Sequence, residues 1–252
     1  MNQQAGIIPG IYNHCDTWCE RCLFTSRCQS FQLQSEAGLI KLQNSEGDLI
    51  QQLTDALSLT KQYMEQLAQH QEPTGDDAPT GLHAQSLEEE PVRSQNSLYY
   101  PVTTLANQYL RQTGQWLNEE KQLLEQTGQQ QIKEVSLGLR TEEEAMPILH
   151  ALKDAWEMIR WYRTLIPVKI QSALRALNNP THDHLLNTYH LGKAKLVLVS
   201  IDRSLLAWQT MIDYYPEKTD GLLDLLVLLG RIRQEMESLF PEARAFKRPG
   251  LD

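Results

Sequence analysis

Four cysteines near the start of the sequence are the side chains best suited to chemistry. They are Cys15, Cys19, Cys22 and Cys28, spaced C-x3-C-x2-C-x5-C, and the chain has no other cysteine. Thiolates grouped in so short a run typically form the ligand shell of a metal ion or an iron–sulfur cluster. The sequence begins without a recognisable export signal, so we expect a reducing, cytoplasmic location and ligation rather than disulfide formation.

The spacing leaves two kinds of metal centre open. Structural zinc sites normally place two to four residues inside each pair of ligands, so the five residues between Cys22 and Cys28 make a loose pair. An iron–sulfur cluster is larger than one ion and accepts ligands from a wrapped loop. We therefore expect all four cysteines to bind one centre, a 4Fe-4S cluster in the first interpretation and zinc in the second. Redox-active or unligated thiols are the remaining alternative.

Part of this run resembles a known cluster-binding element. Cys19 to Cys28 reads C-x2-C-x5-C, and Phe24 stands two residues after the second cysteine of that element. In these features it is similar to the iron–sulfur element of CRISPR adaptation exonucleases and AddAB-type nucleases, which implies a four-iron cluster. Those families use a distant first cysteine, whereas Cys15 is local, and their nuclease core is absent from this sequence. The whole run also resembles the N-terminal signature of uncharacterised bacterial helical proteins, which implies a family but no activity.

Composition narrows the classes of partner. The net charge is −9 and the isoelectric point about 5.3, which argues against nucleic acid because a phosphate backbone needs a basic surface. No stretch approaches the roughly 20 apolar residues that a membrane span requires. We expect a protein partner and no membrane association, and the sequence leaves the oligomeric state open.

Apolar residues recur at helical spacing through most of the chain and predict an all-α protein. The expected organisation is an antiparallel helical bundle with an N-terminal four-cysteine metal-binding module. In order along the chain, we expect a cysteine-rich metal-binding module and lead-in (1–46), a first bundle helix (47–71), a flexible acidic linker (72–96) and the helical bundle (97–252).

Within residues 97–252 the sequence predicts four helices, joined by short turns that favour antiparallel neighbours. Their expected ranges are about 100–127, 141–177 and 183–214, with a last helix from Thr219 or Asp220 to just before Pro241. The clearest start is the capping box from Thr141 to Glu144. Gly128 is expected to stop the first of these helices.

Charged residues in or beside the apolar arcs of the helices at 141–177 and 183–214 form a second candidate site. They are Arg163, Lys169, Lys193 and Asp202. Buried charges must be paired, which favours a structural ion-pair network between these two helices. The alternative is a pocket for an anionic ligand, lined by the three cations and balanced by Glu157 or Asp202.

Two functions follow from these sites. The first is a non-enzymatic metal-binding protein that acts as a redox sensor or through a protein partner. The second is an enzyme whose polar pocket lies between the helices at 141–177 and 183–214, with a structural zinc or an electron-transfer cluster. The sequence contains no glycine-rich phosphate loop or nucleophile elbow. Whether the protein is an enzyme therefore stays open, and catalytic residues cannot be named.

Overall fold

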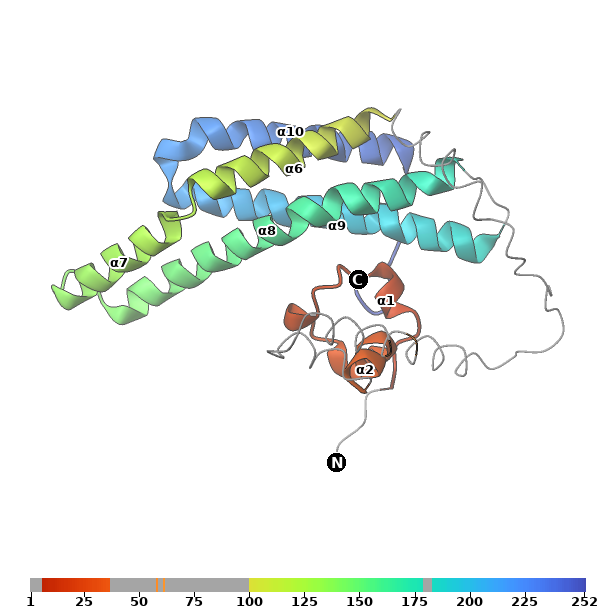
Figure 1. The fold of residues 1–252 in the computed structure, drawn as a ribbon, viewed down its shortest axis with the longest axis horizontal. Helices are drawn as coiled ribbons and strands as arrows, with labels where there is room; N and C mark the ends of the chain where they lie inside the picture. Colours follow the sequence, from red (N-terminus) through yellow and green to blue (C-terminus); the bar gives the residue numbers. More distant parts are fainter. Residues whose placement is uncertain (1–5, 37–57, 59–60, 62–99, 179–182) are drawn as a thin grey trace. The chain divides into compact units, whose positions relative to one another are not determined.

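The computed structural model describes residues 6–36, Ser58, Lys61, 100–178 and 183–252 (Figure 1). Every regular element among them is helical, which confirms the predicted all-α fold. Apart from Ser58 and Lys61, both helical and exposed, the predicted first bundle helix (47–71) and acidic linker (72–96) lie outside the described residues.

The chain divides into two compact units. One combines residues 1–86 with 248–252, and the other spans 87–247. The sequence-based boundary had assigned the whole of 97–252 to the bundle. The last five residues instead belong to the unit that holds the cysteines. Hydrophobic periodicity does not report such an association between segments far apart in the sequence.

The cysteine-containing unit consists of short helical segments joined by tight turns. α1 spans Ile11–His14 and α2 spans Gln29–Glu36. Between them, η1 (Cys19–Arg21) and η2 (Thr25–Arg27) are single turns of 3-10 helix. Such short turns leave few hydrogen bonds inside each segment, so the path of this chain depends on contacts between segments.

The second unit begins with α6 (Pro101–Glu119), followed by α7 (Leu123–Ser136). Pro101 occupies the first turn, where its missing N–H would have no helical partner. The sequence predicted one continuous helix over this region. The structure breaks it after Glu119, and the carboxylate of Glu120 accepts a hydrogen bond from Lys218 at 2.6 Å. This contact joins residues far apart in the sequence, so local pattern could not predict the break.

The expected stop at Gly128 is wrong, because α7 continues through it to Ser136. The stop lies at Gly138, whose φ is +70°, a left-handed conformation that glycine adopts without steric penalty. The amide of Gly138 bonds the carbonyl of Val135 at 3.0 Å, and the amide of Leu139 bonds that of Glu134 at 2.9 Å. This paired pattern is a Schellman motif, which satisfies carbonyls that the helix end would otherwise leave open.

α8 (Glu142–Asn178) begins at the predicted capping box. The Thr141 amide donates to the Glu144 carboxylate at 3.0 Å, and the Glu144 amide donates to the Thr141 hydroxyl at 3.3 Å. α9 spans His184–Tyr214, and the Asp183 carboxylate caps it by accepting hydrogen bonds from the amides of Leu185 and Leu186. These two starts match the sequence prediction because both caps are local.

The last helix, α10 (Thr219–Leu239), follows the short turn η4 (Pro216–Lys218) and ends before Pro241, as predicted. α8 and α9 share the most extensive interface, and α6 packs on α8 and α10 (Figure 1). The largest side chains buried in this bundle are Trp208, Tyr109, Tyr162, Leu152, Ile159, Ile166 and Ile170. In the described part of the chain, no helix combines the length and apolar composition that crossing a membrane requires.

Candidate metal centre

Each of the four cysteines lies where a short helical turn begins or ends. Cys15 directly follows α1, in an extended conformation. Cys19 is the first residue of η1, and Cys22 directly follows that turn. Cys28 follows η2 and precedes α2. The Cys22 amide bonds the Cys19 carbonyl at 3.2 Å, so the C-x2-C pair is closed into one turn by its own backbone.

The four side chains line a single cavity. Its wall is made of Ile11, Cys15, Asp16, Thr17, Trp18, Cys19, Cys22, Thr25, Cys28, Phe31 and Leu251. All four cysteines are free thiols and all are half-buried. The structure thus brings together side chains that the sequence distributes over 14 positions, from Cys15 to Cys28. Apolar side chains, above all Ile11, Trp18 and Phe31, supply much of the remaining wall.

Backbone amides hydrogen-bond to two of the sulfur atoms. The Phe24 amide donates to Cys22 Sγ at 3.4 Å. The Thr17 amide donates to the sulfur of Cys15, and Thr17 adopts a φ of 58°, a left-handed conformation rare for this residue type. Amide donors stabilise a thiolate and, in iron–sulfur proteins, tune the reduction potential of the cluster. The turns therefore supply both the thiols and the amide donors.

Burial raises the pKa of the Cys15 thiol and that of the Cys19 thiol. The neighbouring cysteines raise both pKa values further, because several thiolates close together repel each other. A bound cation would remove the repulsion and stabilise the deprotonated ligands.

The size and shape of the cavity bear on which centre it suits. Among the described residues, no group of three or more Cys, His, Asp or Glu side chains is placed to hold a metal ion. The space inside the cavity is about 20 Å³, close to what one water molecule needs. A larger group would therefore require the turns that carry the cysteines to move outward.

Two arginines lie in the module, and each has a partner of its own. The guanidinium of Arg21 lies over the ring of Trp18, 4.6 Å from its centroid. Arg27 donates from Nε to the carbonyl of Gly6 at 3.1 Å. The contact of Arg21 places its charge on a side chain that itself lines the cavity, whereas Arg27 holds the chain preceding α1.

Leu251 is the part of the cavity wall that sequence reasoning missed. It lies more than 200 positions beyond the cysteines and yet belongs to the same compact unit. A local signal was present, because Pro249-Gly250 is a strong turn dipeptide and Arg248 and Asp252 carry opposite charges on either side of it. That signal predicts a turn at these residues, but it does not predict that the turn packs beside the cysteines.

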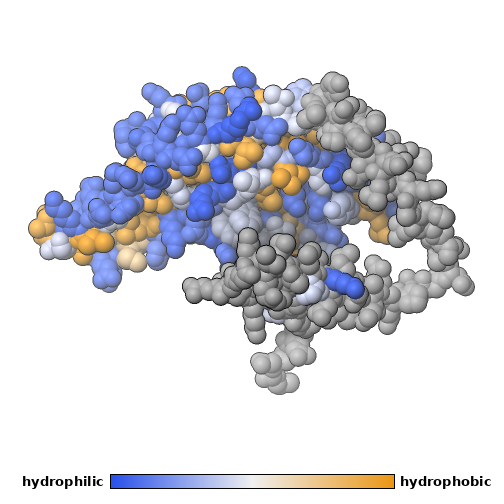
Figure 2. All heavy atoms as spheres, viewed as in Figure 1, coloured by the Kyte–Doolittle hydropathy of each residue, from blue (hydrophilic) through white to orange (hydrophobic). Residues whose placement is uncertain are grey.

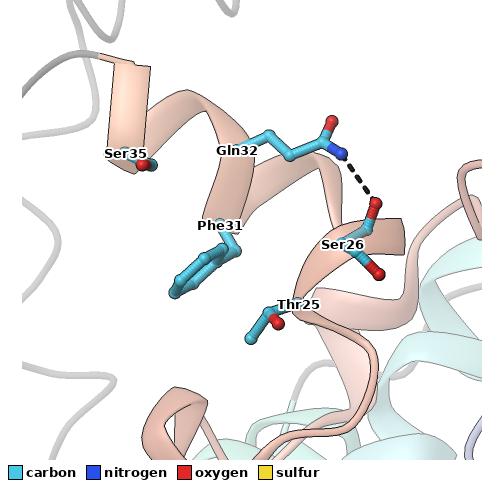
Figure 3. Close-up of a pocket in the computed structure, with 5 residues that line it drawn as sticks. All are labelled: Thr25, Ser26, Phe31, Gln32 and Ser35. Carbon is cyan, nitrogen blue, oxygen red and sulfur yellow. Dashed lines mark hydrogen bonds between the residues drawn. The ribbon is translucent and has the colours of Figure 1, made fainter.

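A second, more open cavity lies between η2 and α2, with a volume of about 340 Å³ (Figure 3). Its lining residues are Thr25, Ser26, Phe31, Gln32 and Ser35. Gln32 donates to the carbonyl of Ser26 at 2.8 Å, which fixes α2 against η2. Thr25 and Phe31 line both cavities, so the two cavities share part of their walls.

The four residues of the second candidate site lie on α8 and α9. Arg163 is half-buried on α8, and its guanidinium packs against Gly114 of α6. Asp202 of α9 pairs with Arg244, which follows α10, and with Arg233 of α10 at 3.9 Å. Arg163 and Asp202 therefore reach toward different helices, and the structure does not bring them together.

The two lysines of that set differ in exposure. Lys193 is only 6% exposed, and its ammonium lies 4.4 Å from the centroid of the Tyr189 ring on the same helix. Lys169 is half-buried on α8. Neither of the two cavities described above includes Arg163, Lys169, Lys193 or Asp202 in its wall.

Two buried serines of α9 are satisfied within the helix, and the exposed Arg203 bonds to a side chain of α8. Ser200 donates to the carbonyl of Leu196, and Ser204 donates to that of Ser200, both at 2.8 Å. Arg203 donates to the Tyr162 hydroxyl at 2.7 Å. These polar groups therefore already have partners in the bundle, which is the pattern of a structural core.

Comparisons with known proteins add no relative. No protein-family model, no curated protein and no solved structure matches this chain.

Proposed function

We propose that Cys15, Cys19, Cys22 and Cys28 bind one metal centre, an iron–sulfur cluster of the 4Fe-4S type, and that the protein acts as a redox sensor or through a protein partner. The observation that carries this proposal is that all four thiols line the same cavity. The ligand set is all sulfur, which suits iron–sulfur clusters and zinc and disfavours magnesium or calcium.

The geometry favours a cluster over a single ion. Zinc needs its sulfur ligands about 2.3 Å from one point. In a cubane, each cysteine binds a different iron, so the four sulfurs stand farther apart. The C-x3-C-x2-C-x5-C spacing suits such a spread of ligands, and all four thiols line one cavity. The amide donors to Cys22 and Cys15 support the same interpretation, because they are contacts that clusters use.

Zinc remains the second candidate because one observation favours it. The space of about 20 Å³ inside the cavity suits a single small species better than a cubane. With zinc, the short turns would close further around the ion and the module would be a structural knuckle.

A partner-binding role is supported by exposed apolar side chains at the turn between α7 and α8. Ile132, Leu137 and Leu139 are 68%, 62% and 74% exposed. Apolar residues gather at this end of the helical unit (Figure 2). Exposed apolar groups that cluster are typical of protein-binding surfaces. The free thiols fit a reducing compartment, and we propose a cytoplasmic location.

The test is metal and sulfide analysis of the full chain purified without oxygen. A 4Fe-4S cluster gives a brown protein that absorbs at roughly 400 nm and contains iron and acid-labile sulfide in equal amounts. A colourless protein with one zinc per chain would replace the cluster with a zinc knuckle. A protein that is purified from iron- and zinc-supplied cells with neither metal bound would contradict both forms of the proposal.

A further inference from the structure

The residues 248–252 form a closed turn. The Leu251 amide bonds the Arg248 carbonyl at 3.0 Å, with Pro249 and Gly250 at the two central positions. Gly250 has a φ of +71°, which a turn of this kind needs at its third position and which glycine adopts freely. The sequence Pro-Gly thus favours this conformation before any tertiary contact forms.

Arg248 and Asp252 clamp the two ends of the turn. The Asp252 carboxylate accepts from the Arg248 amide at 3.0 Å, and from its guanidinium at 2.6 Å between Nη2 and Oδ1. The Arg248 side chain is only 6% exposed and that of Asp252 is 23% exposed, so this pair is largely shielded from water. A charge-assisted pair with several hydrogen bonds holds its geometry more firmly than a single surface contact.

The turn packs closely on the module that carries the cysteines. A Cβ placed on Gly250 would lie 2.8 Å from Cγ2 of Ile8, so the absence of a side chain permits the approach. The Ile8 amide bonds the carbonyl of Arg27, which directly precedes Cys28, at 3.0 Å. Leu251, the next residue of the turn, is half-buried and lines the cavity together with all four thiols.

We propose that the turn 248–252 is a built part of the thiol centre, in which Leu251 covers the cysteines and shields them from thiol reagents, chelators and oxidants in solution. The part of this proposal that concerns a metal centre rests on the proposed function. An apolar wall around a centre controls the access of water and solutes to it. The Pro-Gly turn, the ionic clamp and the contact with Ile8 position Leu251 for this task.

The first arm of the test measures metal retention in the full chain. Leu251→Ser is loaded alongside the wild type, and loss of the centre is followed under excess chelator or, for a cluster, by bleaching in air. We expect equal initial loading and a loss rate higher by on the order of tenfold. The matched control is Leu23→Ser, because Leu23 lies between two of the cysteines in sequence but is 90% exposed and does not line the cavity. It should lose metal at the wild-type rate.

The second arm needs no metal. The metal-free full chain is treated with iodoacetamide, and the alkylation rate of each cysteine is measured by mass spectrometry, since this rate depends on access to the thiol. We expect Leu251→Ser to be alkylated several-fold faster than the wild type and Leu23→Ser. Gly250→Ala is a second variant that should act likewise, because its φ strains any other residue and its Cβ would meet Ile8.

The two arms separate this inference from the proposed function. Faster alkylation in a chain that binds no metal supports the wall and overturns the metal centre. Metal binding with unchanged alkylation and unchanged metal loss in both Leu251→Ser and Gly250→Ala overturns the wall and leaves the metal centre standing. If the cysteine module of Leu251→Ser misfolds, as judged by faster proteolysis within residues 6–36, the Gly250→Ala rates decide.

Discussion

The guanidinium of Arg163 on α8 occupies the space where a side chain on Gly114 of α6 would begin. Its Nη1 atom is the nearest group to a Cβ placed on that glycine. Arg163 thus packs on the backbone of a neighbouring helix and not on a carboxylate. The relationship accounts for a glycine within the helix α6, where it weakens local helix stability by up to about 1 kcal/mol.

This contact predicts that Gly114 and Arg163 are energetically coupled. In an Arg163→Ala background, Gly114→Ala should raise the free energy of unfolding by roughly 0.5–1 kcal/mol, because alanine favours the helix more than glycine does and no guanidinium stands in its way. In the wild-type background the gain should be smaller, because the guanidinium must first move away. A double-mutant cycle by urea denaturation, followed by circular dichroism, measures the difference.

Gly230→Ala is the matched control for this pair. Gly230 lies in α10, and a Cβ there would meet nothing within 4 Å. Its substitution should therefore stabilise the protein by about 0.5–1 kcal/mol in both backgrounds. Equal gains from Gly114→Ala with and without Arg163 would show that the two residues do not interact.

A second prediction concerns the metal ligands. Each of Cys15→Ser, Cys19→Ser, Cys22→Ser and Cys28→Ser should lose most of the bound metal, because all four side chains line one cavity. Metal content per chain after anaerobic purification is the measurement. Ser26→Ala, an exposed change in the same module, should keep full occupancy. Full occupancy in Cys28→Ser would refute a four-ligand centre.

A third prediction is that the bundle folds without the metal. The helices α6 to α10 belong to their own compact unit and bury their own apolar core. Metal removal by a chelator should therefore leave most of the far-ultraviolet helical signal in place, whereas signals from Trp18 beside the thiols should change. Collapse of the helical signal when metal is removed would show that the two units fold as one.

A fourth prediction concerns the buried hydrogen bond between Trp208 and Tyr109. The indole Nε1 donates to the Tyr109 hydroxyl at 3.1 Å, and both side chains are fully buried. Tyr109→Phe removes the acceptor and leaves the indole N–H unsatisfied, which should lower the free energy of unfolding by about 1–3 kcal/mol. Tyr215→Phe is the control. The Tyr215 hydroxyl hydrogen-bonds with the Thr127 hydroxyl at 2.8 Å in a less buried place, so its removal should lower the free energy of unfolding by less.

The same tyrosine gives a pH dependence. Burial raises the pKa of Tyr109 above its ordinary value of about 10. In the unfolded chain this hydroxyl loses its proton first, so the unfolded state is favoured as the pH rises above 10 and stability should fall there. In the Tyr109→Phe variant, the free energy of unfolding should fall less steeply with rising pH, as measured by a series of urea titrations between pH 9 and 11. An identical slope in the variant would mean that Tyr109 does not contribute.

The sequence by itself determined what depends on near neighbours. The starts of α8 and α9 were predictable because each cap joins residues two or three positions apart. That the four cysteines lie close together was predictable because they stand within one short run. The prediction that the helix ends at Gly128 was wrong for a related reason. Periodicity does not distinguish a glycine inside a helix from one that must adopt a positive φ, as Gly138 does.

Only the tertiary structure decided which distant groups meet. The partners of Asp202 are Arg244 and Arg233, and not the cations of α8 that the sequence analysis had grouped with it. Leu251 completes the cavity of cysteines from the other end of the chain. Such pairings depend on how helices rotate and pack against each other, and those rotations are set by the summed burial of many side chains. A periodic pattern shows which face of a helix is buried, but not which residue lies opposite.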